Sequence, residues 1–277
     1  MHNLKRAEAI INRSNPVDLD LLVLPEMAFT GYNFGSAEEI DFHLEPTAAG
    51  PSSVWARTMA RRFKCYVCVG YPEYAAVSPS SPNPTVVRYN SAVMVSPQGN
   101  VIANYRKHHL YTTDETWAAP GGEGFLTSYE ERLGRFAMGI CMDLNPERFL
   151  APFNKYEFAN HVLTSGAELV VMPMAWLTTH PELLEDEAPV PDSETLAYWI
   201  QRLQPIVDVG GYNGKEIIFI AANRCGTENG AAYAGTSVVL GIRQGNVKVY
   251  GCLGRGVEDL LIADIAPSFT KPISRWR

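Results

Sequence analysis

The chain has 277 residues, of which 46% are hydrophobic, so it can bury a substantial core. Its formal net charge of −7, without any block of Lys or Arg, argues against a nucleic-acid surface or a basic membrane-binding face and favours a neutral or cationic partner. The apolar runs are shorter than the roughly 18 to 20 residues that span a bilayer, and the N-terminus lacks the apolar core of a signal peptide.

Helical and strand-like patterns alternate along the chain, which predicts an α/β fold. In the first half we expect a helix at 3–14, a strand at 20–26, a Gly-rich loop at 27–39, a helix from about Ser52 to Phe63, a strand at 64–73, an exposed Pro- and Ser-rich loop within 74–87, and a hairpin of strands at 89–96 and 100–107. No linker-like stretch divides the chain, so we expect one domain over residues 1–277.

The second half continues the alternation. We expect a loop at 108–125, a strand at 135–141, a helix at 153–166 that ends at Gly166, a strand at 167–176, a helix near 193–208, a strand at 215–223, a hairpin over 236–251 and a final strand at 259–265. No internal repeat of fixed length is present in the sequence.

Five cysteines are an odd and sparse set for a chain of this length, unlike the disulfide framework of a small secreted protein. We therefore expect free thiols in a soluble, cytoplasmic protein. Cys65 and Cys68 form a C-x-x-C pair, but no second pair completes a metal site and the flanking residues are apolar. We interpret them as buried strand residues, and Cys225 and Cys252 in the same way.

Three predicted strands end in reactive side chains, at Glu26, Lys107 and Cys141. The functional crevice of an α/β sheet lies beyond its strand ends, so these side chains could converge there. A carboxylate can take the thiol proton, and an ammonium group can stabilise the thiolate and a developing oxyanion, helped by the N–H of Met142 in the turn after the cysteine.

A cysteine–histidine pair is the alternative, since His108 and His109 follow Lys107. Adjacent residues of an extended chain point in opposite directions, so at most one of them could share the face of the lysine. We favour the carboxylate as the base.

The segments LVLPEMAFTGY, YRKHHLY followed by DE, and GICMDLNPE, in that order, resemble the signature segments of the nitrilase (carbon–nitrogen hydrolase) superfamily. The resemblance covers nearly the whole chain. It implies an α-β-β-α sandwich, with two sheets face to face and helices outside, and a Glu-Lys-Cys triad that needs no metal and no cofactor. Glu26 would be the base, Lys107 the lysine, Cys141 the nucleophile and Glu115 a second glutamate that orients the lysine.

Further segments, GYNF, YTTDETW, GICMDLNPERFLAPFNKYEFANH and MPMAWLT, look closest to fungal-type protein N-terminal amidases. Such enzymes deamidate an N-terminal Asn or Gln to Asp or Glu through a cysteine thioester, release ammonia and so create a degradation signal. The implied partners are protein or peptide N-termini, not nucleic acids or membranes. Trp176, Tyr32 and Asn33 are implied to line the substrate pocket, and Asp114 and Trp117 are weaker candidates.

Two other functions stay open at this point. One is an amidase or carbamoylase for a small free amide, which would use the same chemistry. The other is a weakly catalytic nitrilase-like scaffold that binds N-termini.

The sequence departs from the superfamily directly after the nucleophile. Many members read C-x-D-x-R-F-P-E, whereas this chain reads C-M-D-L-N-P-E, which is one residue shorter and has no arginine. Without that partner, the Asp143 carboxylate could meet the α-ammonium group of a substrate. The equally favoured alternative is that Asp143 caps the turn or pairs with Arg148.

The N-terminus is a second departure. A nitrilase-like domain normally begins with a strand before its first helix, whereas this sequence opens with the helical pattern itself. We therefore expect the first strand to be missing, with strand groups left unpaired at that place.

Overall fold

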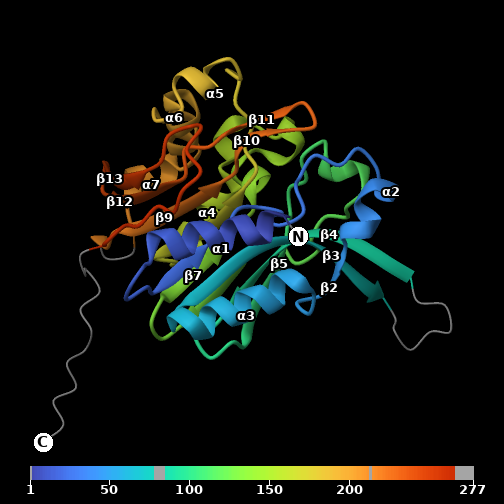
Figure 1. Cartoon of the computed structure of the whole chain (residues 1–277). Coiled ribbons are helices and arrows are strands. Elements are labelled where there is room, and N and C mark those ends of the chain that lie inside the picture. The colour runs from blue at the N-terminus through green and yellow to red at the C-terminus, as the bar shows by residue number, and fades with distance from the viewer. Residues whose placement is uncertain (1, 78–84, 212–213, 266–277) are drawn as a thin grey trace, which may run out of the picture.

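The computed structural model describes residues 2–77, 85–211 and 214–265. Two β-sheets lie face to face, with helices on their outer sides (Figure 1). In the described part, the first sheet has the order β1-β3-β4-β5 with β2 beside β3, and the second has the order β13-β12-β9-β8-β7-β6. This is the α-β-β-α sandwich expected from the sequence.

The bounds of the elements follow the predicted alternation closely. The helices are α1 (His2–Ser14), α2 (Ala37–Ile40), α3 (Pro51–Phe63), α4 (Glu157–Ser165), α5 (Leu183–Asp186), α6 (Ser193–Arg202) and α7 (Gln204–Val209). The strands are β1 (Leu21–Val23), β2 (Glu45–Pro46), β3 (Tyr66–Val77), β4 (Thr85–Val95), β5 (Val101–Arg106), β6 (Leu126–Glu130), β7 (Gly134–Met138), β8 (Leu169–Met174), β9 (Ile217–Asn223), β10 (Cys225–Glu228), β11 (Ala231–Ala234), β12 (Val238–Arg243) and β13 (Asn246–Cys252).

Alternation along β3 divides its side chains between two apolar layers. Val67 and Val69 pack against α1 and α3 on the outside of the first sheet, whereas Cys68 packs into the layer between the sheets. Cys65 belongs to the outer layer, so the two cysteines of the C-x-x-C pair lie in different layers. All five cysteines of the chain are free thiols, as predicted.

The long apolar run LVVMPM forms strand β8 in the interior of the second sheet. Every residue of β8 is buried, because β8 lies between parallel neighbours and both of its faces are covered. Its inner face meets the first sheet, and its outer face meets α4, α6 and α7. The strand ends beside β7, which precedes Cys141.

Several predicted bounds need correction. The helix expected at 193–208 is two helices, since Pro205 cannot continue the hydrogen-bonding ladder of α6. The helix expected at 153–166 begins at Glu157, because Tyr156 has a left-handed backbone with φ of 46°. It ends at Gly166, as predicted. Strands β6, β10 and β11 were not predicted, and the Pro- and Ser-rich stretch 78–84 lies outside the described residues.

The final predicted strand, 259–265, is not a strand in the structure, and an open groove lies beside it. Among the described residues, β1 pairs with a strand on one edge only, through β3. The groove has a volume of about 520 Å³ and is lined by α1, β1, the Ile218 and Ile220 side of β9, and residues 257–265. Without a hydrogen-bonding neighbour, residues 259–265 do not form a ladder. The expectation of a missing first strand stays a prediction.

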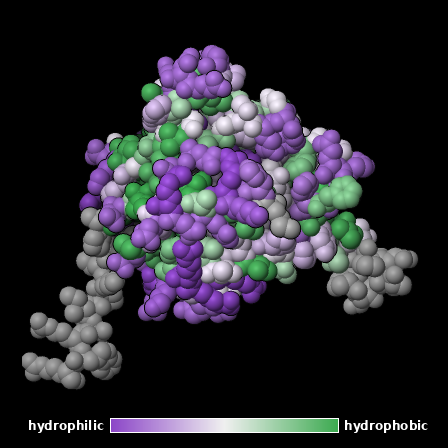
Figure 2. Space-filling view, viewed as in Figure 1, coloured by the Kyte–Doolittle hydropathy of each residue, from purple (hydrophilic) through white to green (hydrophobic). Residues whose placement is uncertain are grey.

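The surface that carries α1 is mixed, with hydrophobic areas between hydrophilic side chains (Figure 2). Across the described residues, no helix has both the length and the apolar character that crossing a bilayer requires.

Candidate active site

Glu26, Lys107 and Cys141 follow the ends of β1, β5 and β7, and the fold brings them to one place between the two sheets. The Lys107 ammonium Nζ lies 2.7 Å from Glu26 Oε1, and both side chains are fully buried. Cys141 is also buried, with 7% of the residue exposed. Burial and the charge of Glu26 raise the pKa of the Cys141 thiol, and the charge of Lys107 lowers it. The strand ends therefore converge as the sequence argument expected.

The position of Glu26 depends on a close approach between two backbones. Gly70 of β3 lies so near that an added Cβ would be 2.6 Å from the Glu26 Cα. Hydrogen bonds from Gly70 N to Pro25 O and from Ala28 N to Gly70 O hold the chain there. Only glycine fits at this contact, which fixes the Glu26 backbone against the first sheet.

Two further buried side chains complete a polar network around Lys107. Its ammonium also contacts Asp114 Oδ2 at 2.5 Å. The Asn90 side-chain amide donates to Glu26 Oε1 at 2.6 Å and to Asp114 Oδ1 at 2.9 Å, so it joins the two carboxylates. Glu26 Oε2, by contrast, has no hydrogen-bond partner among the described residues. One oxygen of Glu26 is thus held in place, and the other remains available to accept a proton.

Cys141 lies in a strained turn. It begins a short 3-10 helix, Cys141–Leu144, and has a φ of 42°. Met27, directly after Glu26, has a φ of 49°. A left-handed backbone is rare for such side chains, and strain of this kind gathers at functional sites. The backbone of Ala175, directly after β8, favours the thiolate form of Cys141 and so lowers its pKa, against the larger effect of burial.

Burial and neighbouring charges define the protonation states. Burial and the Glu26 charge raise the pKa of the Cys141 thiol well above its ordinary value. Burial opposes the charge of Lys107, but the Asp114 and Glu26 carboxylates outweigh it and raise the lysine pKa. Burial also raises the pKa of Glu26, against the lowering effect of Lys107. The site therefore rests with a neutral thiol, a permanent ammonium and a carboxylate that can take a proton.

Comparisons with known proteins agree on one family. The carbon–nitrogen hydrolase family model matches residues 1–153. A protein N-terminal amidase of Schizosaccharomyces pombe is 33% identical over 261 residues, which cover 88% of this chain and 86% of that protein. The chain belongs to the carbon–nitrogen hydrolase family.

Two other relatives extend this comparison. A protein N-terminal amidase of Saccharomyces cerevisiae is 35% identical over 197 residues, covering 64% of this chain and 41% of that protein. The crystal structure of an N-terminal amidase with an Asn-Glu-Ala peptide has a TM-score of 0.81 and 24% identity, and the match covers 93% of this chain and 92% of the other. This second likeness shows the shared fold.

One residue of the expected hydrolase site must be corrected. Glu115 does not contact Lys107; its carboxylate is at the surface and pairs with Arg148 at 3.2 Å. Asp114 contacts the lysine instead. The 3-10 helix Asp114–Thr116 turns these neighbours in different directions, so only one of them can point into the buried network.

The structure decides between the two roles that the sequence left equally open for Asp143. The side chain is fully buried, and its two oxygens accept four hydrogen bonds, from the Tyr105 hydroxyl and from the backbone N–H groups of His108, His109 and Ile140. No acceptor position faces outward for a substrate ammonium. Asp143 caps the nucleophile turn, which is the alternative that the sequence left open, and the partner of Arg148 is Glu115.

The other expected pocket residues lie at different depths. Tyr32 is buried with the Lys107 ammonium 5.5 Å from its ring centre, so it forms part of the wall of the hydrolase site. Trp176 is half-buried, and its ring packs edge-on against the ring of Trp199. Asn33 donates its side-chain amide to Asn229 O. Trp117 is buried in the same apolar cluster as Tyr32.

Asn90 was missed from the sequence. It lies within β4, at the start of a run of buried residues, and carries no local signal of a functional role. The one available clue is its pairing: Lys107 N donates to Asn90 O, so any correct alignment of β4 and β5 places Asn90 beside the lysine.

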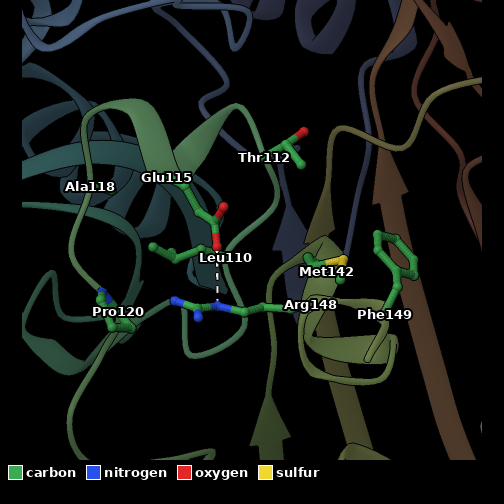
Figure 3. A pocket seen from close by; sticks show the side chains of 8 residues that line it. All are labelled: Leu110, Thr112, Glu115, Ala118, Pro120, Met142, Arg148 and Phe149. Carbon is green, nitrogen blue, oxygen red and sulfur yellow. Dashed lines mark ion pairs between the residues drawn. The ribbon is translucent and has the colours of Figure 1, made fainter. Parts of the chain in front are cut away.

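A surface cavity of about 490 Å³ adjoins the nucleophile turn (Figure 3). Leu110, Ala118, Met142 and Phe149 supply apolar lining, and the Glu115–Arg148 ion pair also lines the cavity. Within the described residues, no group of three or more His, Cys, Asp or Glu side chains is arranged as a metal site.

Proposed function

We propose that this protein is an amidase that deamidates an N-terminal Asn or Gln of proteins and peptides to Asp or Glu and releases ammonia. The amide chemistry is supported by one observation above all: a thiol, an ammonium and a carboxylate oxygen without a partner meet in one place. The substrate class is supported by the 33% identity with the N-terminal amidase of S. pombe.

In the proposed first step, Glu26 Oε2 takes the thiol proton while the Cys141 sulfur attacks the side-chain carboxamide carbon of the substrate. A base is required because the thiol pKa is raised by burial, so little thiolate exists beforehand. The Lys107 ammonium and the Met142 N–H stabilise the oxyanion. The Met142 amide lies in the first turn of a 3-10 helix, where leading N–H groups have no acceptor within the helix.

In the second step, the proton held by Glu26 moves to the leaving nitrogen, ammonia departs and a thioester remains. Water then attacks the thioester, with Glu26 again accepting a proton, and the new carboxylic acid and the thiol are released. One water is consumed and one ammonia is formed. Lys107 stays charged throughout, because two carboxylates stabilise its ammonium.

Asn90 and Asp114 are proposed as positioning residues. Asn90 donates to Glu26 and to Asp114, and Asp114 accepts from Lys107, through contacts of 2.5 to 2.9 Å. They leave Glu26 Oε2 as the one carboxylate oxygen of this residue that can act as the base. With one ammonium and two carboxylates, the network carries a net charge of −1 (+1 − 2), which favours a substrate with a positive N-terminus.

Mass spectrometry of Asn- and Gln-initiated peptides tests the proposal. The wild-type protein should produce the deamidation mass change and ammonia, and Cys141→Ser should produce neither. Cys225→Ser is the matched control, since Cys225 is a free thiol outside the site. N-acetylated peptides should react poorly. Equal turnover of acetylated peptides would instead favour a general small-amide hydrolase.

We also propose a cytoplasmic location, in which the product would serve as a degradation signal. The five free thiols support a reducing compartment. Fractionation of cells that express a tagged full-length protein tests this location.

A further inference from the structure

The cavity of about 490 Å³ lies beside the nucleophile turn of the candidate active site. Met142, which lines the cavity, directly follows Cys141. Leu110, Glu115 and Ala118 come from the loop that also carries Asp114, and Asp114 contacts Lys107. The cavity thus shares two chain segments, the loop around Asp114 and the turn after Cys141, with the candidate active site.

The chemistry of the cavity is mainly apolar. Five of its eight lining residues are apolar, and the polar ones are Thr112 and the Glu115–Arg148 ion pair. Glu115 and Arg148 form an ion pair with each other. Their side chains are 40% and 67% exposed, respectively. An exposed pair of this kind is largely screened and provides little net attraction for a charged ligand. The apolar walls therefore dominate recognition.

A second observation, independent of the cavity, lies in the segment after Arg148. Phe149, Leu150 and Phe153 are large apolar side chains with exposed fractions of 55%, 83% and 45%. Arg148 and Phe149 also have left-handed backbones, with φ of 53° and 57°. Clustered exposed apolar side chains mark interaction sites, and bulky residues keep a left-handed backbone only where their surroundings hold it.

We propose that this cavity binds the second residue of the substrate peptide and that it favours an apolar side chain such as leucine. The inference rests on the proposed function, because it assumes that the first residue presents its carboxamide to Cys141. The second side chain then packs against Met142 and Phe149. Phe149 is the specificity-determining residue for this position.

Steady-state kinetics with two peptides that differ only at position two, Asn-Leu and Asn-Gly, test the inference. We expect the leucine peptide to have a kcat/KM about tenfold higher, which is the effect of burying most of one aliphatic side chain. The gain should appear in KM, since this contact is present in both the ground state and the transition state.

The variant Phe149→Ala should remove most of the preference by raising KM for the leucine peptide, with little change for the glycine peptide. Phe42→Ala is the matched control: Phe42 is 94% exposed, so the same atoms are removed at a place outside the site. This control should keep the wild-type preference. Melting curves of both variants check that folding is retained.

Two results would overturn the inference while leaving the proposed function intact. One is equal kcat/KM for the two peptides, and the other is a leucine preference that survives Phe149→Ala. If neither peptide releases ammonia, the proposed function itself is wrong and the inference fails with it.

Discussion

Replacing Asp143 by Asn distinguishes a carboxylate that holds the nucleophile turn from one that binds substrate. Asp143 Oδ1 accepts from the backbone N–H groups of His108 and His109 at 3.1 and 2.7 Å. Oδ2 accepts from the Tyr105 hydroxyl and from Ile140 N, both at 2.7 Å. An asparagine keeps one acceptor oxygen, and its nitrogen only donates. The tyrosine hydroxyl can turn and accept from that nitrogen, but the Ile140 N–H is left without an acceptor.

The magnitude follows from this inventory. A buried donor without an acceptor costs about 1–3 kcal/mol, and each of the remaining bonds loses about 1 kcal/mol when the acceptor is no longer charged. Relief from burying a charge, which raises the pKa of Asp143, offsets part of this loss. We expect the free energy of unfolding to fall by about 3 kcal/mol. For a chain of this size the melting temperature should then fall by roughly 6–12 °C.

Thermal unfolding followed by circular dichroism measures this effect, with the exposed Asp186→Asn as the matched control. Ammonia release should also drop, and in equal proportion for every peptide, because the Cys141 turn is displaced. The capping role of Asp143 is contradicted if Asp143→Asn melts like the wild type and loses activity only toward peptides with an unmodified α-amino group. That outcome would restore the substrate-binding role.

Three further predictions concern the site and its surroundings. The Asn90 hydrogen bond lowers the pKa of Glu26, so Asn90→Ala should move the acid limb of the pH profile of kcat/KM to higher pH, an effect that a purely structural role would not produce. Asp114→Asn should lower kcat by about 100-fold or more, the effect of breaking a buried ion pair, whereas Glu115→Gln should stay within about threefold in the same ammonia assay. Burial alone would raise the pKa of Glu73, but hydrogen bonds from Arg106, Ser91, Thr47 and Asn104 hold it below its ordinary value. Because the unfolded chain then binds the proton more tightly, the stability contributed by Glu73 is present above about pH 4.3 and is lost as the pH falls through the folded-state pKa. Urea unfolding should therefore show Glu73→Gln less stable than the wild type at pH 7, with the difference shrinking toward pH 3.

The features that the sequence predicted well are those with a local or motif signal. Apolar periodicity located α1, α3 and the strands that carry Glu26, Lys107 and Cys141, and the convergence of the three side chains followed from the general position of strand ends. The burial of Cys65 and Cys68 followed from the apolar residues that flank them, whereas their separation into two layers came from the structure.

The features that the sequence predicted wrongly or left open depend on contacts between distant segments. Asp114 and Glu115 are adjacent acids, and only the direction of a short helical turn decides which one meets the lysine. One carboxylate oxygen of Asp143 accepts hydrogen bonds from the backbones of His108 and His109, some 35 residues earlier in the chain. No local sequence pattern reveals these contacts. Residues 259–265 have the pattern of a strand, but a strand needs a neighbour to pair with.

The raised pKa of the Cys141 thiol has a consequence for resistance to damage. Peroxides oxidise thiolates, and enzymes whose cysteine rests as an exposed thiolate are readily inactivated by conversion to the sulfenic acid. In this protein the pKa of the thiol is raised and only 7% of the residue meets solvent. We therefore expect peroxide to oxidise Cys141 more slowly than a cysteine that rests as an exposed thiolate, which mass spectrometry of the peroxide-treated protein measures.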